Sequence, residues 1–254
     1  RDEDARADRS PGEFYQLDME MSFVTQDDVF GVVEDVISGV FRKFSDWKST
    51  AIPFPRITYR DSMVKYGSDK PDLRIPIEIV EVGDMFRASK FNAFKNVVEK
   101  GGVVRAVPVR AIADKPRSFF DKLEEFAKSL GARGLGYLVW AAGAVKGPIA
   151  KFMTAEELAG LAGRCGAGSG DVIFFVADCA KVASKIAGEL RLKLGRDLDL
   201  VEKNVYKFCW IVDFPFFEFD EEQQKVVCSH NPFSMPRGGL KALEEANPLD
   251  VVAW

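Results

Sequence analysis

A row of polar side chains near the start of the chain is the feature best suited to chemistry. Between residues 14 and 23 apolar and polar residues alternate, which predicts a strand with one buried face. The polar face carries an aromatic ring, an amide and two carboxylates, in the order Phe14, Gln16, Asp18 and Glu20. Stacked acids gain little on an ordinary surface strand, so this row favours a site that receives a cation or an amine.

The composition of the chain indicates the class of protein to which this strand belongs. The chain has 254 residues, of which 47% are hydrophobic and 29% charged, as in a globular protein with one large domain or two smaller ones. The net charge is −4 and the pI about 5.3, which argues against a broad basic face for nucleic acid. No apolar run is long enough to cross a bilayer, so we expect no membrane association.

The ends of the chain and its cysteines indicate where the protein works. The first residues are charged and include neither an initiator Met nor an apolar leader, so we expect a fragment of a longer cytoplasmic protein. The four cysteines form no Cys-x-x-Cys pair and the chain has a single His, which leaves no zinc set. We expect reduced and mostly buried thiols, and no metal site within this chain.

Helix and strand signals divide the chain into three parts. Thr25 and Asp28 predict a capped helix, and a stripe of apolar residues from Val29 to Phe44 predicts its core face. Residues 66–74 form a polar loop and a candidate boundary. After it come strands at 103–112, 136–140 and 171–177, and helices at 116–130, from Thr154 to about Gly163, and at 179–194.

The last part of the chain, from about residue 202, again has sequence patterns typical of strands. The apolar run 208–214 and a hairpin over 217–228 around an acidic turn suggest an antiparallel sheet, like the start of the chain. We therefore predict a split domain, with residues 1–68 and 202–254 forming one unit and residues 69–201 inserted between them. The glycines at 166, 168 and 170 precede a strand instead of opening a helix, so we interpret them as a turn and reject a phosphate loop. Basic residues on the 179–194 helix, among them Arg191, are interpreted as its solvated face.

Three separated segments carry a family resemblance. Residues 1–23, which begin with Arg1-Asp2-Glu3, resemble motif 2 of class II aminoacyl-tRNA synthetases and in particular the bacterial aspartyl enzymes. The resemblance continues at 66–74 and 228–236, and the segment between them is similar to the inserted GAD domain of those enzymes. It implies an α+β fold: a partial antiparallel class II catalytic core interrupted by a mixed α/β GAD insertion.

The resemblance also implies roles for the polar row and its neighbours. Arg1 would hold the α-phosphate of ATP and act in catalysis, because a guanidinium suits the charge on a five-coordinate phosphorus. Asp2 and Glu3 would join the ATP site, where Phe14 would stack on adenine. Asp18 would bind the ammonium of L-aspartate. The residues grouped with it in the aspartate pocket are Arg1, Gln16, Glu20 and His230.

The same resemblance places tRNA against the loop before the polar row. Arg6, Asp8 and Arg9 would contact the acceptor end. Because acids balance the arginines, this loop would act by specific pairing and not by bulk attraction. Ser10 stands where many relatives have Gln, and Gly12 resembles an insertion, so contacts at positions 10–12 stay open.

The implied activity is aspartate–tRNA ligation with ATP as substrate and Mg²⁺ as cofactor, in a homodimer of the full-length protein. Motif 1 and the anticodon-binding domain would precede Arg1, and motif 3, the Mg²⁺-binding acid and a carboxylate-reading arginine would follow Trp254, so we expect the chain alone to be inactive. Whether tRNA(Asn) is charged besides tRNA(Asp) stays open. The alternative is a catalytically inactive GAD-type module that binds tRNA or a partner. A third interpretation, a paralogue that makes a small amide, would lack the inserted segment.

Overall fold

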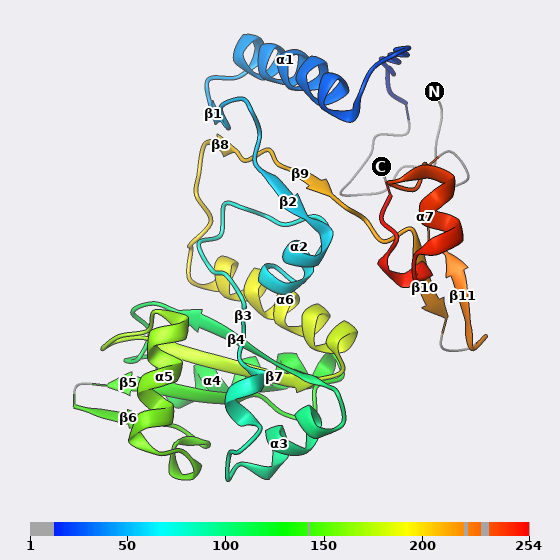
Figure 1. Cartoon of the computed structure of the whole chain (residues 1–254). Helices are drawn as coiled ribbons and strands as arrows, with labels where there is room; N and C mark the ends of the chain where they lie inside the picture. The colour runs from blue at the N-terminus through cyan, green and yellow to red at the C-terminus, as the bar shows by residue number, and fades with distance from the viewer. Residues whose placement is uncertain (1–12, 142, 221–222, 230–233, 254) are drawn as a thin grey trace. The chain divides into compact units, whose positions relative to one another are not determined.

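The computed structural model describes residues 13–141, 143–220, 223–229 and 234–253 (Figure 1). The chain divides into two compact units. The first unit comprises residues 1–45 and 51–53, and the second comprises residues 46–50 and 54–254. The predicted residues Arg1, Asp2, Glu3, Arg6, Asp8, Arg9 and His230 lie outside the described ranges.

Helix α1 (Gln26–Phe44) is the main element of the first unit, and its predicted start is confirmed. Thr25 Oγ1 accepts from the Asp28 N–H at 3.4 Å, and Asp28 Oδ2 accepts from the Thr25 N–H at 2.7 Å, which completes the capping box. The predicted apolar core face is covered only in part, because Val33, Val36, Ile37 and Phe41 are half-buried, whereas Val40 is 46% and Phe44 75% exposed. An amphipathic helix buries its stripe only against another element, and the described part of this unit holds no second helix.

The strand predicted for residues 14–23 is wrong. Residues 14–21 have no regular secondary structure, and the face expected to be buried is open, with Tyr15 and Leu17 among its exposed side chains. A strand persists when a neighbouring strand satisfies its backbone groups. The described residues of the first unit supply no such neighbour.

The second unit is built on a five-stranded sheet with the order β3-β4-β7-β5-β6. Every neighbouring pair in it is antiparallel. The strands are β3 (Val80–Glu81), β4 (Val103–Val109), β5 (Gly136–Ala141), β6 (Ala144–Lys146) and β7 (Val172–Asp178). Strand β7 lies in the middle and is buried on both faces, which explains its continuous apolar sequence.

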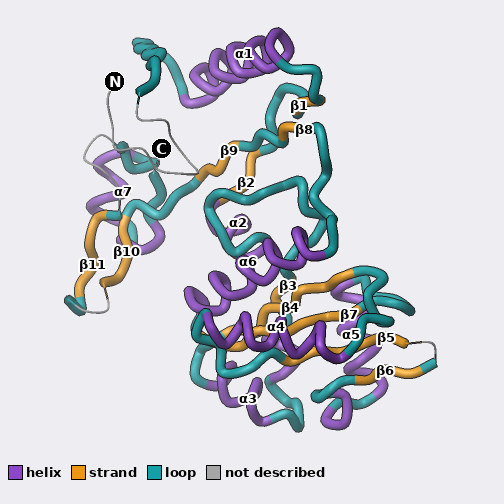
Figure 2. The backbone as a smooth tube through the Cα atoms, turned by 180° about the vertical axis from the view of Figure 1, so that it is seen from behind, coloured by secondary structure: helices purple, strands orange, loops and turns teal. Residues whose placement is uncertain are grey.

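Helices cover both faces of this sheet (Figures 1 and 2). Phe174 packs in the cluster that includes α4 (Arg117–Ser129) and α6 (Ala180–Asp197). Phe175, the next residue, packs on the opposite face with residues of η1 (Gly83–Phe86), α3 (Asn92–Glu99) and α5 (Ala155–Cys165). The alternation of side chains along β7 thus joins two helical layers through one sheet.

Most predicted elements of this region are confirmed. Thr154 and Glu157 form the expected capping box of α5, which ends at Cys165 with Gly166 in the left-handed conformation, two residues later than predicted. Helix α4 follows Pro116 as expected. The sequence reasoning missed α3, because it has only 8 residues and no side-chain cap.

Shorter elements flank the sheet region. Strand β1 (Lys48–Ser49) pairs with β8 (Val205–Tyr206), and β2 (Arg56–Thr58) pairs with β9 (Trp210–Val212). Both pairs are parallel, which corrects the antiparallel arrangement predicted there. The hairpin is confirmed as β10 (Phe217–Asp220) and β11 (Lys225–Cys228). The remaining elements are α2 (Tyr59–Lys65), η2 (Ala150–Phe152), α7 (Gly239–Glu245) and η3 (Pro248–Asp250).

The predicted fold class is confirmed at the level of a mixed α/β protein with an antiparallel sheet, while the assignment of residues 69–201 to a GAD insertion stays a prediction. The cysteine prediction is corrected. The four cysteines are thiols and not disulfides, but Cys165 is the buried one, Cys209 is half-buried, and Cys179 and Cys228 are exposed. Within the described ranges, no helix is both long and apolar enough to span a bilayer.

Candidate functional site

The described part of the polar row lies on the irregular segment of the first unit. Gln16 Nε2 donates a hydrogen bond to Asp18 Oδ1, so the amide and the carboxylate point to the same side of the chain as predicted. Gln16, Asp18 and Glu20 are exposed, and Phe14 is half-buried. An oriented carboxylate that keeps acceptor capacity can receive an ammonium group, which is the chemistry expected of this row.

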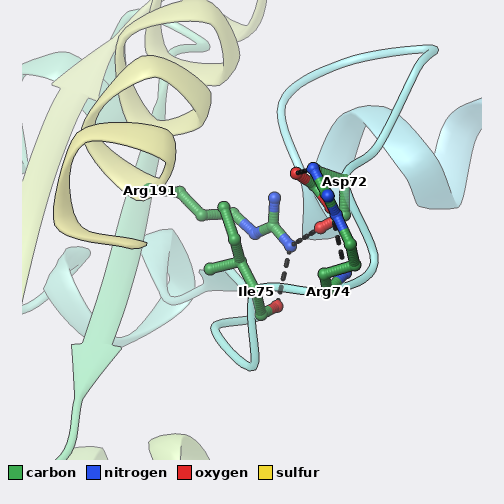
Figure 3. Close-up of polar contacts among 4 residues, drawn as sticks. All are labelled: Asp72, Arg74, Ile75 and Arg191. Atoms are coloured by element: carbon green, nitrogen blue, oxygen red, sulfur yellow. Dashed lines mark hydrogen bonds and ion pairs between the residues drawn. The ribbon is translucent and has the colours of Figure 1, made fainter. Parts of the chain in front are cut away.

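The second candidate is the loop over residues 66–77 of the second unit, which one buried arginine holds in place (Figure 3). Arg191 on α6 is 1% exposed. Its Nε donates to the carbonyl of Ile77 at 2.6 Å, and its Nη2 donates to the carbonyls of Asp72 at 2.8 Å and Ile75 at 2.9 Å. A single guanidinium therefore satisfies three carbonyls from one loop, which fixes the path of the backbone there.

Burial and neighbouring charges act in opposite directions on Arg191. Burial lowers the pKa of its guanidinium, and the Asp72 carboxylate, the Tyr66 phenol and Glu78 partly restore it. The guanidinium carbon also lies 5.0 Å from the centre of the Tyr66 ring, in a cation–π arrangement. Arginine stays charged under such shifts, so the loop is anchored by a permanent cation.

Asp72 and Arg74 form an ion pair within the loop. Arg74 Nε and Nη2 donate to the two carboxylate oxygens of Asp72 at 2.8 Å and 2.7 Å, and the Arg74 backbone N–H donates to the same group. The side-chain hydrogen bond from Arg74 is the main cause that lowers the pKa of Asp72. Since Asp72 and Arg74 pair with each other, Lys70 is the exposed charged residue of the described loop.

A backbone contact supports the loop from α6. A side chain at Gly67 would begin 2.2 Å from the carbonyl oxygen of Ser184 and 2.7 Å from the Gly188 Cα. Gly67 also has a φ of +70°, which L side chains rarely adopt. Two glycines therefore let the loop lie directly on the helix backbone.

The sequence reasoning missed the role of Arg191 and placed it on a solvated face, which is wrong. The signal was available, because Arg191 falls between Ala187 and Leu194 on the apolar face of α6, and both of those side chains are buried. A basic residue at an apolar position of a helix indicates a buried anchor when neighbouring carbonyls need donors.

The turn predicted at the three glycines is confirmed. The Gly168 N–H donates to Asp171 Oδ2 at 2.9 Å, and Arg110 donates to the same carboxylate at 2.7 Å and to the Gly166 carbonyl. Burial by itself raises the pKa of Asp171, but the bonds from Gly168, Arg110 and Ala111 outweigh it and lower the pKa. The turn is thus a structural clamp and not an anion site.

Metal ligation has no support in the described ranges, where no three His, Cys, Asp or Glu side chains gather closely enough to hold an ion. We therefore assign no Mg²⁺ ligand to these residues.

Fold and sequence together define the class of protein. The model for class II tRNA synthetases (D, K and N) matches residues 1–252, and the chain belongs to this family. The mixed α/β architecture with an antiparallel sheet agrees with a part of such an enzyme.

Individual members of this family are similar to the chain over all or nearly all of its length. The chain is 55% identical over 255 residues to the aspartate–tRNA(Asp/Asn) ligase of Anaplasma phagocytophilum, with all of this chain and 42% of the relative covered. It is 56% identical over 251 residues to the ligase of the same name from Rickettsia bellii, covering 98% of this chain and 42% of the relative. The chain thus spans about 42% of the length of these curated relatives.

Proposed function

We propose that this chain is the part of an aspartate–tRNA ligase that binds the amino acid, ATP and the acceptor end of tRNA. The reaction joins L-aspartate to ATP as aspartyl-adenylate and then transfers the aspartyl group to tRNA. The single structural observation in support is the hydrogen bond from Gln16 to Asp18, which orients a carboxylate as an ammonium receptor requires. The names of the relatives favour the ligase over the alternative of an inactive binding module.

Within this proposal the site residues keep the roles given by the family resemblance. Arg1 stabilises the charge on the α-phosphate, Asp2 and Glu3 complete the ATP site, and Phe14 stacks on adenine. Asp18 binds the substrate ammonium beside Gln16 and Glu20, and His230 lines the same pocket. Arg6, Asp8 and Arg9 contact the tRNA acceptor end.

We also propose the division into residues 1–68, 69–201 and 202–254. The pairs β1–β8 and β2–β9 support it, because each joins a strand before residue 68 to a strand after residue 202. The five-stranded sheet lies wholly between these limits. Its closed two-sided core is what an inserted domain needs in order to fold as a unit.

The name of the relatives supports a proposal for the acceptor. Because their printed name specifies tRNA(Asp/Asn), we propose that the full-length protein charges both tRNA(Asp) and tRNA(Asn). We further propose that it acts in the cytoplasm as a homodimer and uses Mg²⁺ held by residues other than those described.

The test is aminoacylation by the full-length protein with purified tRNA(Asp) and tRNA(Asn). The Asp18→Asn variant removes the charge that receives the substrate ammonium, so we expect the KM for aspartate to rise by about tenfold or more. The matched control is Asp35→Asn, an exposed acid on α1 that has no assigned role. An unchanged KM in Asp18→Asn would contradict the assigned pocket, and failure to charge tRNA(Asn) would contradict only the dual specificity.

A further inference from the structure

A cavity of about 670 Å³ opens at one end of the five-stranded sheet, far along the sequence from every residue assigned to the ligase reaction. Strand β7 ends there at Asp178, and β4 and β5 begin there, because the neighbouring strands are antiparallel. Helix α3 and the segment from Arg133 to Gly136 form further walls. The volume lies in the range of small-molecule sites, which is roughly 300–1,000 Å³.

The floor of the cavity is apolar. Phe91, Phe94, Leu135 and Ile149 line it, and Phe94 and Leu135 are buried. Phe91 and Phe94 lie edge to face with ring centres 4.7 Å apart. These rings are held in the sheet core, so the floor is formed before any ligand arrives.

Glycines keep the cavity open. A side chain at Gly136 would begin 3.0 Å from the Phe94 ring. A side chain at Gly134 would begin in open space, with only Glu124 Oε1 at 4.0 Å. The position of Gly134 is therefore one where a larger residue can grow into the cavity without displacing the wall.

The rim of the cavity carries charged side chains of both signs. Glu124 pairs with Lys128 at 2.7 Å, and Asp178 accepts from the Cys179 N–H at 2.7 Å. Lys100 and Arg133 are exposed, and the side chain of neither makes an ion pair or a hydrogen bond with a residue that the structure describes. The rim thus offers two cations without a described partner over an apolar floor, and Asp178 keeps its negative charge beside the start of α6.

We propose that this cavity is a second binding site, for a small ligand that has a flat apolar body and one anionic group. The body fills the space over Phe91 and Phe94, and the anion lies between Lys100 and Arg133. The N–H of Cys179 at the start of α6 already donates to Asp178, so the two side chains alone supply the positive charge for the anion. Neutral and cationic analogues of the same shape lack this complementarity.

The test uses the chain itself and three probes of one shape: 2-naphthoate, 2-naphthamide and 2-naphthylmethylammonium. Cys179 lines the cavity and is exposed, whereas Cys228 is exposed and does not line it. We expect 2-naphthoate to slow alkylation of Cys179 by iodoacetamide, measured by mass spectrometry of the two peptides, with no change at Cys228. Equal protection of both thiols, or of neither, would overturn the proposal.

Charge selectivity is the second outcome. We expect 2-naphthoate to protect at concentrations about threefold to tenfold lower than the amide, since exposed charge pairs give modest gains. In the Lys100→Gln/Arg133→Gln variant this preference should vanish, while the amide still protects. A preference that survives in the variant would assign the anion to other groups and refute the site as described.

Filling the cavity gives the third outcome. Gly134→Leu should abolish protection of Cys179. The matched control is Gly163→Leu, at an exposed position of α5 where the first side-chain carbon would meet no atom within 4 Å, and it should leave protection unchanged. Buried Cys165, whose pKa burial raises to about 11, reports folding, because it stays unalkylated in a folded variant. Protection retained in a folded Gly134→Leu variant would place the ligand elsewhere.

Discussion

Helices α1 and α5 begin with the same type of N-terminal cap but differ in how much of their apolar face is buried. Each has a threonine capping box, at Thr25 and at Thr154. On α5, Leu161 is fully buried against the sheet, whereas on α1 Phe44 is 75% exposed. The comparison teaches that capping residues determine where a helix begins, but a layer of other elements determines whether its apolar face is covered.

The largest expected effect tests whether the sheet region holds most of the stability. Phe174→Ala removes a ring from between β7 and the helices α4 and α6, and we expect the free energy of unfolding to fall by about 3–5 kcal/mol. Urea denaturation followed by circular dichroism measures it. Phe44→Ala on α1 is the matched control, with a change below about 0.5 kcal/mol. Similar losses in both variants would remove the contrast between the two regions.

The next effect concerns the anchor of the 66–77 loop. Arg191→Met leaves the carbonyls of Asp72, Ile75 and Ile77 without their donor, so we expect a loss of about 3 kcal/mol and faster hydrogen exchange in the loop. Arg196→Met, at an exposed position of the same helix, should cost less than about 0.5 kcal/mol. If the two variants unfold alike, the loop is held by its own contacts and not by α6.

Asp171 gives the sheet region a dependence on pH. Its pKa is lower in the folded protein than in the unfolded chain, so its contribution is present above about pH 4 and is lost as pH falls through the folded value. We expect Asp171→Asn to cost about 2 kcal/mol at pH 7, because the Arg110 and Ala111 donors lose a carboxylate. Unfolding curves between pH 7 and pH 2 should show a constant difference down to about pH 4 and then the two proteins converging, and a difference that stays constant below about pH 4 would contradict this cause.

The smallest expected changes in stability come from removing the capping threonines of α1 and α5, the two helices compared above. Thr154→Ala and Thr25→Ala each remove one cap, at a cost of about 1 kcal/mol. We expect Thr154→Ala to lower the urea midpoint of the sheet region and Thr25→Ala to speed hydrogen exchange only in α1. A shift of the whole transition by Thr25→Ala would mean that both units unfold together.

Sequence reasoning succeeded where local chemistry decides the structure. The capping pairs located α1 and α5, and the apolar run before Cys179 located β7. Sequence reasoning failed where a neighbouring element of the fold determines the structure. The segment at residues 14–23 has the pattern of a strand but lacks a described neighbour, and β2 and β9 are only 3 residues each, too short for periodicity to show their direction.

In the candidate site, too, local features could be predicted and contacts between distant segments could not. The shared orientation of Gln16 and Asp18 could be predicted, because it depends on residues two apart. The burial of Arg191 could have been inferred from its place on the apolar face of α6, but its three acceptors could not, since they are more than 110 residues earlier in the sequence. Contacts of that span depend on the completed sheet and its helices.

The crossing of Gly67 over Gly188 has a mechanical consequence. Where side chains lie between neighbouring elements, they can change rotamer when one of the elements shifts. At this crossing backbone meets backbone, so there is no compliant layer to absorb a displacement. A shift of α6 is therefore transmitted directly to the backbone at Gly67.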